Sequence, residues 1–466
     1  MNDGTGESAP KSLWAGRFTK EPAAEALALG RSLDFDIELL DADIWASQAH
    51  VRALMDAGLL SEEEASALDE ALESLPDKLA QLTEDDVADV EDVHLLVERT
   101  LIAELGDLGA KLHAGRSRND LVVTDLRLWL LGACSEIQSQ TERLVQVLAA
   151  RAREGAEWVM PGLTHDRPAQ VVTLGYYMAA HAFGLLRDLE RLDDWAERAA
   201  VSPLGAGAIA TSTLDLDPEA TAERLGMTGP FDNALDAVAD RDFVIEFVSC
   251  LSTLSMHVSR LAADLARWSE PRLGFARLDD AFSTGSSMMP QKRNPDVLEL
   301  ARGKASRVLG DLAGLAALPI GLPLGYHRDF QEDKEPVFDA AYAVTTVLPA
   351  VIGCLETVTF DPDSMRVAAN DEDLFATDIA EALVRSGLPF REAHRRTGGL
   401  LRDLGESGRG LRDMTTEEWV EFGVAEGASM LDPHASVGAR STRGGPSPEQ
   451  VRAQADLIES RLASRE

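Results

Sequence analysis

The chain has 466 residues, roughly three to four times the length of a typical domain, which is enough to bury a large core without disulfides or metal ions. It carries 80 acidic and 44 basic residues, a formal net charge of -36, and a surface this negative repels phosphate backbones, which excludes nucleic-acid binding over a broad face. Apolar residues make up 45% and charged residues 27% of the chain, the balance of a globular rather than a disordered protein.

Lysine is scarce, since only seven of the 44 basic residues are lysines. An acidic, lysine-poor surface is the expected result of adaptation to high salt, where counterions screen the self-repulsion. A GC-rich genome combined with ordinary acidity explains the same counts equally well. Thermal unfolding in low salt and in molar KCl separates the two explanations, because only the first predicts stabilisation by salt.

The three cysteines, Cys134, Cys250 and Cys354, lie far apart without a Cys-x-x-Cys spacing or a neighbouring histidine. They are typical of buried thiols in a reducing compartment. The first twelve residues lack the basic and apolar regions of a secretory signal. The longest uncharged stretches, near 199–214 and 312–326, are too short or too broken to span a bilayer. We therefore expect a cytoplasmic protein without a membrane span.

Most of the chain has helical periodicity. The segment that starts at Ser61 is the clearest case, because Ser61 is an N-cap residue, acids fill the first turn and apolar residues follow at spacings of three and four. Aromatic residues are only 5% of the chain and strand signals are few, which favours helix over sheet. Long helices are expected over residues 120–154, 169–199, 233–270, 296–316 and 336–358.

Breaks without periodicity, rich in Gly and Pro, separate these helices near residues 158–168, 202–215, 279–296 and 318–336. Long helices joined by such loops are typical of a helical bundle with small domains at either end. Helices of this length expose more apolar surface than one chain covers, so we expect an oligomer.

The break before residue 296 holds the most unusual residues, in the sequence TGSSMMPQKRNPD. Backbone N–H groups near Gly285, the Ser286 hydroxyl, the Lys292 ammonium and the Asn294 amide could together bind a carboxylate and the charge that develops on it. The alternative is a surface loop in which Asn294 caps the next helix and Pro295 is its first residue. Capping leaves the Gly-Ser-Ser run and Lys292 unexplained.

This loop resembles the signature loop of the fumarase/aspartase superfamily, and its many fixed positions make a chance match improbable. Other segments resemble the argininosuccinate lyase family and follow in order over roughly residues 12 to 455 of the chain. These segments are SLWAGRF (12–18), EDVHLLVERTL (91–101), KLHAGRSRND (111–120), MPGLTH (160–165), SPLGAGA (202–208), NALDAVADRDF (233–243), LPLGYHRDFQEDKEPVFD (322–339) and ATDIAEALVRSGLPFREAH (376–394).

The resemblance implies an all-α, fumarase/aspartase-like fold in which long central helices form a tetrameric bundle flanked by two smaller helical domains. In this chain the N-terminal domain would span residues 1–115, the central bundle 116–364 and the C-terminal domain 365–466. The family members are homotetramers without a metal or organic cofactor, and each active site takes loops from three subunits. They act on a small-molecule substrate and bind neither nucleic acid nor membrane.

The family cleaves argininosuccinate into arginine and fumarate by β-elimination, the last step of arginine synthesis. By resemblance Ser286 is the base that removes the proton next to a carboxylate. A serine hydroxyl is too weak an acid to do this unaided, so Lys292 and the loop amides would stabilise its alkoxide and Asn294 would hold the same carboxylate. By the same resemblance His165 protonates the leaving amine and the Glu299 carboxylate is its partner, a pairing that keeps an imidazole charged near pH 7.

Several further positions match residues that bind substrate in the family: His94, Ser117, Arg118, Asn119, Thr164, Arg241, Asn294, Tyr326, Gln331 and Lys334. An arginine such as Arg118 is the natural bidentate partner of a carboxylate. Three of the matching segments have a simpler alternative. His165 would be a structural histidine, residues 117–119 a helix N-terminus, and residues 326–334 a charged, solvated helix start.

The sequence departs from the family pattern at four places: Asp166–Arg167 follow His165 in place of Leu-Gln, Leu121 replaces Gln, His327 replaces Asn, and Val171–Val172 replace the usual continuation after AQ. None of these changes touches the expected base or carboxylate clamp. They leave the leaving amine open, so a related lyase that releases fumarate from a different N-substituted aspartate remains an alternative. A catalytically idle protein on the same scaffold is disfavoured because it would not need to retain Ser286, Lys292, Asn294 and His165 together.

Overall fold

The computed structural model of the chain describes residues 23–465, so the segment SLWAGRF at 12–18 lies outside the described residues. The described chain forms two compact units. The first comprises residues 23–132, 196–245 and 315–337, and the second comprises 133–195, 246–314 and 338–465. Their boundaries fall within long helices, so these units do not coincide with the division into domains 1–115, 116–364 and 365–466, which stays a prediction.

The first unit is built from short and medium helices. In chain order its helices are α1 (Ala24–Gly30), α2 (Leu33–Asp36), η2 (Ile37–Leu39), α3 (Leu40–Asp56), α4 (Glu62–Glu73), α5 (Leu75–Leu79), η3 (Glu84–Val87), α6 (Val93–Leu105), α7 (Asp107–Lys111), the first half of α8 (Arg118–Glu154), α10 (Pro218–Arg224), α11 (Ala234–Ala239) and η6 (Arg328–Asp333). Strands β3 (Val201–Ser202) and β4 (Gly229–Pro230) form a two-residue parallel pair.

The helix predicted from Ser61 is confirmed as α4. The Ser61 hydroxyl accepts the N–H of Glu64, and the Glu64 carboxylate accepts the N–H of Ser61, a reciprocal capping box. The apolar face of α4 carries Leu68 and Leu72, which are fully buried in a cluster with residues of α3 and α6. Burial of this face, rather than local propensity, gives the helix most of its stability.

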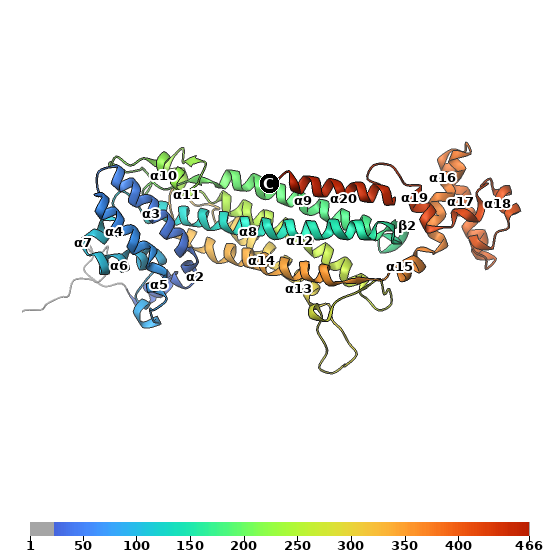
Figure 1. Cartoon of the computed structure of the whole chain (residues 1–466), viewed down its shortest axis with the longest axis horizontal. Coiled ribbons are helices and arrows are strands. Elements are labelled where there is room, and N and C mark those ends of the chain that lie inside the picture. Colours follow the sequence, from blue (N-terminus) through green and yellow to red (C-terminus); the bar gives the residue numbers. More distant parts are fainter. Residues whose placement is uncertain (1–22, 466) are drawn as a thin grey trace, which may run out of the picture. The chain divides into compact units, whose positions relative to one another are not determined.

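The second unit contains the long helices. They are the rest of α8, α9 (Leu174–Ala199), α12 (Asp242–Trp268), α13 (Asp296–Ala317) and α14 (Lys334–Thr357), together with α20 (Pro448–Ala463). Figure 1 shows these helices running along one direction. Contacts join them: Cys134 of α8 donates to the Leu192 carbonyl of α9, Arg151 of α8 donates to the Leu355 carbonyl of α14, and α12, α13 and α14 line one small apolar cavity. The all-α fold with long central helices is therefore confirmed.

Two helix predictions were wrong at their N-terminal ends. Residues 169–173 are not helical, because β2 (Arg167–Thr173) pairs with β1 (Val159–Thr164) in an antiparallel hairpin. The β-branched run Val171–Thr173 suits a strand, and the pairing with β1 overrides the apparent helical period. The helix expected over 233–270 is divided into α11 and α12, because Asp240 has an extended backbone with ψ of 130°.

The remaining elements of the second unit are helices and two-residue strands, most of which come after the hairpin in the sequence. They are η4 (Gly155–Glu157), β5 (Ala276–Arg277), η5 (Asp280–Phe282), β6 (Thr359–Phe360), α15 (Pro362–Ala369), η7 (Glu372–Phe375), α16 (Ala376–Arg385), α17 (Phe390–Glu406), η8 (Leu411–Asp413), α18 (Thr416–Phe422), η9 (Gly427–Met430) and α19 (Pro433–Gly438). Val159 and Val171 at the base of the hairpin belong to a buried cluster with Phe375, Leu383 and Trp419. The C-terminal helices thus hold the base of the hairpin in place.

One segment, Arg328–Thr357, is long and apolar enough to cross a membrane by length and composition, and 56% of its apolar window is buried. It contains η6 and α14, and its apolar residues Val337, Val344 and Leu355 are buried within the protein. The core helix of a soluble protein has these properties, so the segment is weak evidence for a membrane span.

Candidate active site

The predicted segment GRSRND lies at the start of α8. The backbone N–H of Ser117 donates to Oδ1 of Asp120 at 2.8 Å, and the N–H of Asn119 donates to the Ser117 hydroxyl at 3.2 Å. These bonds satisfy amides that a helix N-terminus leaves without intrahelical partners. The Arg118 guanidinium forms an ion pair with Asp92 at 2.9 Å, and the Asn119 amide donates to the Ala208 carbonyl at 3.1 Å.

The segment 326–334 forms η6 and enters α14. Lys334 is almost fully buried, and its Nζ lies 2.7 Å from Oδ1 of Asp333 and 3.2 Å from the Phe330 carbonyl oxygen. The Gln331 side-chain oxygen accepts a hydrogen bond from Nε of Arg328 at 2.9 Å. The segment is therefore not a solvated helix start, since its lysine has a buried counter-charge.

These two segments line one pocket of about 460 Å³ in the first unit, together with part of α2 and the start of α6. Seven of the ten residues predicted to bind substrate are among its lining residues: His94, Ser117, Arg118, Asn119, Tyr326, Gln331 and Lys334. We call it the substrate pocket because of this prediction from the sequence. The sequence prediction missed seven further lining residues: Ser32, Asp36, Glu91, Asp92, His113, Val122 and Arg328. Glu91, Asp92, His113 and Arg328 lie inside the segments that carry the resemblance. Ser32, which precedes α2, Asp36 of α2 and Val122 lie outside these segments and had no such signal.

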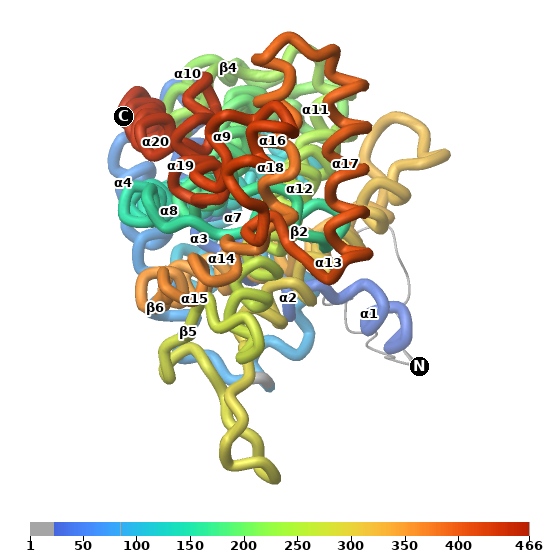
Figure 2. Tube along the Cα trace, turned by 90° about the vertical axis from the view of Figure 1, so that its right-hand side faces the viewer, coloured from blue at the N-terminus to red at the C-terminus, as the bar shows by residue number. Residues whose placement is uncertain are grey.

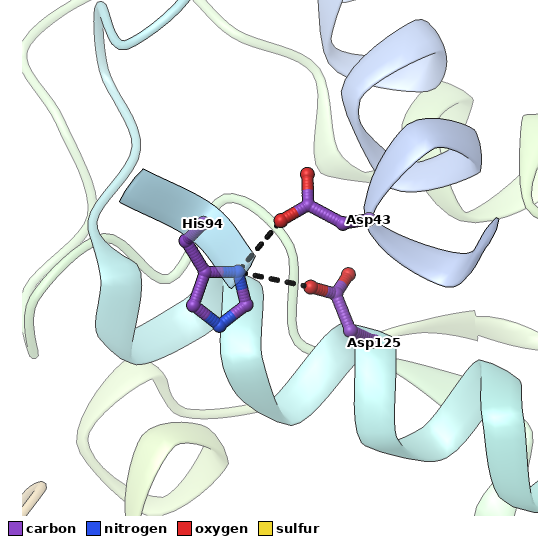
Figure 3. Close-up of side chains that lie close together, drawn as sticks. All are labelled: Asp43, His94 and Asp125. Atoms are coloured by element: carbon purple, nitrogen blue, oxygen red, sulfur yellow. Dashed lines mark hydrogen bonds and ion pairs between the residues drawn. The ribbon is translucent and has the colours of Figure 1, made fainter. Parts of the chain in front are cut away.

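Two buried aspartates, Asp43 and Asp125, lie next to His94 of the pocket. Nδ1 of His94 is 2.6 Å from Oδ2 of Asp43 and 3.4 Å from Oδ2 of Asp125 (Figure 3). Burial by itself lowers the pKa of His94, but the hydrogen bond and the charge of Asp43 outweigh it and raise that pKa above its usual value. Burial raises the pKa of Asp125 well above its ordinary range, and the charge of Asp43 adds to that rise.

Arg241 does not line the substrate pocket. Arg241 is 4% exposed. Its guanidinium forms an ion pair with Asp333 and lies 4.3 Å from the centre of the Phe330 ring. Asp333 therefore joins Arg241 to Lys334. This arrangement makes Arg241 a structural support for Lys334 in the described structure.

Thr164 and His165 lie at the tip of the β1–β2 hairpin in the second unit. Thr164 pairs with Arg167, and the two residues between them, His165 and Asp166, have positive φ angles of 53° and 58°. Two successive residues with positive φ form the tight turn that matches the twist of the two strands in a hairpin with a two-residue loop. Asp166 forms an ion pair with Arg267 of α12 at 2.5 Å, so this departure from the family pattern anchors the turn.

The loop of Ser286, Lys292 and Asn294 joins β5 to α13. Figures 1 and 2 show this loop, in yellow, projecting away from the long helices of its unit. Its two ends are joined by backbone hydrogen bonds between Thr284 and Asn294, at 3.1 and 2.8 Å. The Ser286 hydroxyl accepts the N–H groups of Met288 at 3.3 Å and Met289 at 3.1 Å.

The Asn294 side chain contributes to closing the loop. α13 begins at Asp296, and the Asn294 side-chain amide donates to the Gly285 carbonyl oxygen at 3.3 Å. Glu299 lies in the first turn of α13, exposed to solvent. Within residues 23–465, no hydrogen bond or ion pair joins Glu299 to His165, and their pairing stays a prediction.

The comparisons with known proteins identify the family of the chain. Residues 16–310 match the family described as Lyase, and residues 373–438 match the family described as Argininosuccinate lyase C-terminal. The chain is 44% identical over 466 residues to the argininosuccinate lyase of Acidothermus cellulolyticus, covering 98% of this chain and 95% of that one. It is 46% identical over 451 residues to the argininosuccinate lyase of Mycolicibacterium vanbaalenii, covering 96% of each.

Two solved structures extend the comparison to the fold. An EDDS lyase in complex with formate has a TM-score of 0.83 and 27% identity, covering 94% of this chain and 89% of that one. An EDDS lyase variant with bound fumarate has a TM-score of 0.81 and 26% identity, covering 96% and 91%. Both structures and the near full-length relatives agree with the resemblance noted in the sequence, and the chain belongs to the argininosuccinate lyase family of carbon–nitrogen lyases.

Proposed function

We propose that this protein cleaves argininosuccinate into L-arginine and fumarate. The observation that carries the proposal is 44–46% identity, over nearly the whole chain, to two argininosuccinate lyases. The EDDS lyases share the fold at only 26–27% identity. The closer similarity to argininosuccinate lyases favours L-arginine as the leaving amine over the amine of another N-substituted aspartate.

The charges of the substrate pocket suit such a substrate. Argininosuccinate has three carboxylates, an ammonium group and a guanidinium group, so its site needs side chains of both signs. Cationic and acidic side chains line the substrate pocket together: Arg118, Arg328, Lys334, Asp36, Glu91 and Asp92. A fully apolar pocket would leave the charged groups of the substrate without partners, at a large desolvation cost.

In the proposed reaction, Ser286 removes the proton from the carbon next to a substrate carboxylate. The electron pair of the broken C–H bond moves into that carboxylate, and Lys292 and Asn294 stabilise the resulting charge; each pre-placed donor is typically worth about 3–4 kcal/mol. The pair then returns to form the double bond of fumarate while the C–N bond breaks. His165, with Glu299 as its proposed partner, gives a proton to the departing nitrogen.

We further propose a homotetramer that works in the cytoplasm. The long helices of the second unit leave large apolar side chains in contact with solvent, among them Met256 at 49%, Leu300 at 63% and Leu309 at 57% exposure. Further copies of the chain that cover these side chains would remove them from water. Light scattering should then give four times the chain mass of 50.3 kDa.

We also propose that each active site combines the substrate pocket of one subunit with catalytic loops of other subunits. Mixing two inactive variants tests this. Ser286→Ala removes the base, and Arg118→Ala removes a cation of the substrate pocket. After joint unfolding and refolding, mixed tetramers should recover part of the activity, because some sites would combine two intact halves. If each chain supplied its whole site, the mixture would stay as inactive as its parents.

A product assay tests the function itself. Purified protein given argininosuccinate should release L-arginine and fumarate in equal amounts, measured by chromatography and ultraviolet absorbance. The reverse reaction, with fumarate and a panel of amines, should then proceed fastest with L-arginine. Fumarate formation from another N-substituted aspartate, without turnover of argininosuccinate, would assign the protein to the alternative function.

A further inference from the structure

The buried cluster of Asp43, His94 and Asp125 lies beside the substrate pocket, and its geometry is specific. Asp43 comes from α3, His94 from α6 and Asp125 from α8, so three helices meet at this point. Figure 3 shows both carboxyl groups on the Nδ1 side of the imidazole ring, with Nε2 on the opposite edge. His94 lines the substrate pocket, whereas both aspartates are fully buried. The ring edge that carries Nε2 is therefore the one available to a ligand.

Asp43 is held in place by further bonds. Its Oδ1 accepts a hydrogen bond from the Ser47 hydroxyl at 3.0 Å, and that hydroxyl accepts one from the Arg116 guanidinium at 2.9 Å. Oδ2 is thereby directed at Nδ1 of His94, at 2.6 Å. A fixed carboxylate beside one ring nitrogen keeps a proton on that nitrogen and orients the ring. The series of hydrogen bonds from Arg116 through Ser47 to Asp43 thus fixes the position of His94.

Asp125 differs from Asp43 although it is equally buried. Among the described residues, neither of its carboxyl oxygens makes a hydrogen bond. An ionised carboxylate without hydrogen bonds in a buried site is very costly, so a neutral carboxylic acid is the stable form. The 3.4 Å separation between Oδ2 of Asp125 and Nδ1 of His94 is then a contact rather than an ion pair.

We propose that Asp43 is a positioning residue, which accepts the Nδ1–H of a doubly protonated His94 ring and thereby directs its Nε2–H into the substrate pocket as a donor to a carboxylate of the substrate. The proposal rests on the proposed function, because it concerns how that substrate is bound. A hydrogen bond to a charged group is worth more than one between neutral groups, so its loss should be measurable as weaker binding.

The pair Asp43→Asn and Asp125→Asn tests the proposal with one chemical change at two neighbouring buried acids. Asp43→Asn should raise KM for argininosuccinate about 10- to 100-fold and change kcat less than about threefold, the signature of lost ground-state binding. Asp125→Asn should leave KM within about threefold, since an amide replaces a neutral acid. Equal effects of the two substitutions would overturn the proposal.

A double-mutant cycle with His94→Asn shows whether Asp43 acts through His94. In the His94→Asn background, Asp43→Asn should add less than about twofold to KM. Independent, multiplying effects would contradict the positioning role. If Asp43→Asn does not fold, Ser47→Ala takes its place, because it removes the hydroxyl that joins Arg116 to the Asp43 carboxylate while leaving that carboxylate in the chain, and KM should rise by an intermediate amount. An unchanged KM would speak against the proposal.

Two further measurements separate this proposal from its competitors. In histidine-15N-labelled protein, the Nδ1–H signal of His94 should be present in the wild type and absent from Asp43→Asn, whether or not argininosuccinate is turned over. If the wild type shows this signal but does not turn over argininosuccinate, the proposed function is wrong and the positioning role of Asp43 toward His94 still stands.

Elemental analysis of the purified protein should find no stoichiometric divalent cation. A cation lost from both aspartate variants would replace the positioning role by a metal site.

Discussion

Oδ2 of Asp120 accepts the backbone N–H of Gly207 at 2.8 Å, which ties the start of α8 to the loop that follows β3. The same oxygen accepts the N–H of Gly205 at 3.1 Å. Gly207 has a φ of +62°, and a Cβ there would lie 2.8 Å from the Thr211 carbonyl oxygen, so the close approach requires glycine. Asp120 thus positions the pocket residues 117–119 without lining the pocket itself.

Asp120 gives the stability of the protein a predictable pH dependence. Burial raises its pKa from the ordinary 3.8 to about 6, although three backbone N–H groups oppose the rise. Between these pH values the folded protein holds a proton that the unfolded chain has released, so this group makes folding less favourable as pH rises from about 4 to about 6. The substitution Asp120→Asn removes this pH-dependent contribution to stability. The free energy of unfolding of the variant, relative to wild type, should increase over this range by roughly 1–3 kcal/mol.

Urea unfolding at fixed protein concentration checks this, since the stability of an oligomer depends on concentration. Asp41→Asn, which removes one carboxylate from an exposed position on α3, is the control for the lost charge. The free energy of unfolding of Asp120→Asn relative to wild type could instead stay constant or decrease as the pH rises. That result would show that Asp120 is not the titrating group.

Asp333 should be essential for stability because it compensates two buried cations, Arg241 and Lys334. Burial raises the pKa of Asp333, but the charges of Lys334 and Arg241 outweigh it and bring the pKa below the ordinary value. Removing one partner of a buried ion pair typically costs about 3–5 kcal/mol. Asp333→Asn should lower the urea midpoint accordingly, while Asp329→Asn, exposed in the same segment, should lower it little. A loss below about 1 kcal/mol would mean that the cations have other partners.

The capping box of α4 should be worth about 1 kcal/mol. Ser61→Ala removes the acceptor of the Glu64 N–H and should lower the free energy of unfolding by that amount with kcat unchanged. Ser66→Ala, at an exposed position within the same helix, removes a hydroxyl without removing a cap. Equal stabilities of the two variants would show that the cap contributes nothing.

The Asp166–Arg267 ion pair should have little influence on turnover. Asp166 is 81% and Arg267 38% exposed, and surface ion pairs contribute at most about 1 kcal/mol. Asn accepts the left-handed backbone of position 166 as readily as Asp does. Asp166→Asn should therefore change kcat less than about threefold, whereas His165→Asn should lower it about 10²–10⁴-fold. A tenfold loss in Asp166→Asn would assign this departure a role in the chemistry.

The long helices were predictable because their periods and caps are local. The helices expected over 120–154 and 296–316 lie at 118–154 and 296–317 in the structure. The β1–β2 hairpin was not predictable, because tertiary packing stabilises it: Val159 and Val171 are buried against C-terminal residues more than 190 positions away in the sequence.

The substrate pocket could be predicted where a motif marked it and not elsewhere. Arg118 and Lys334, far apart in the sequence, were expected to bind the same substrate because of the family resemblance, and both line the pocket. Asp43 and Asp125 stand in ordinary helical patterns, and nothing in the sequence separates them from surface acids. Only the meeting of α3, α6 and α8 reveals their contact with His94.

The rate of fumarate release by Ser286→Ala, compared with wild type and Ser287→Ala, tests the central claim most directly. Wild type given argininosuccinate should turn over at about 1 s⁻¹ or faster, a common enzyme rate. Ser286→Ala should lose about 10²–10⁴-fold in kcat, while Ser287→Ala, which removes the adjacent hydroxyl of the same loop, should stay within about tenfold of wild type. A Ser286→Ala variant that keeps a third of the wild-type kcat would contradict the assignment of Ser286 as the base.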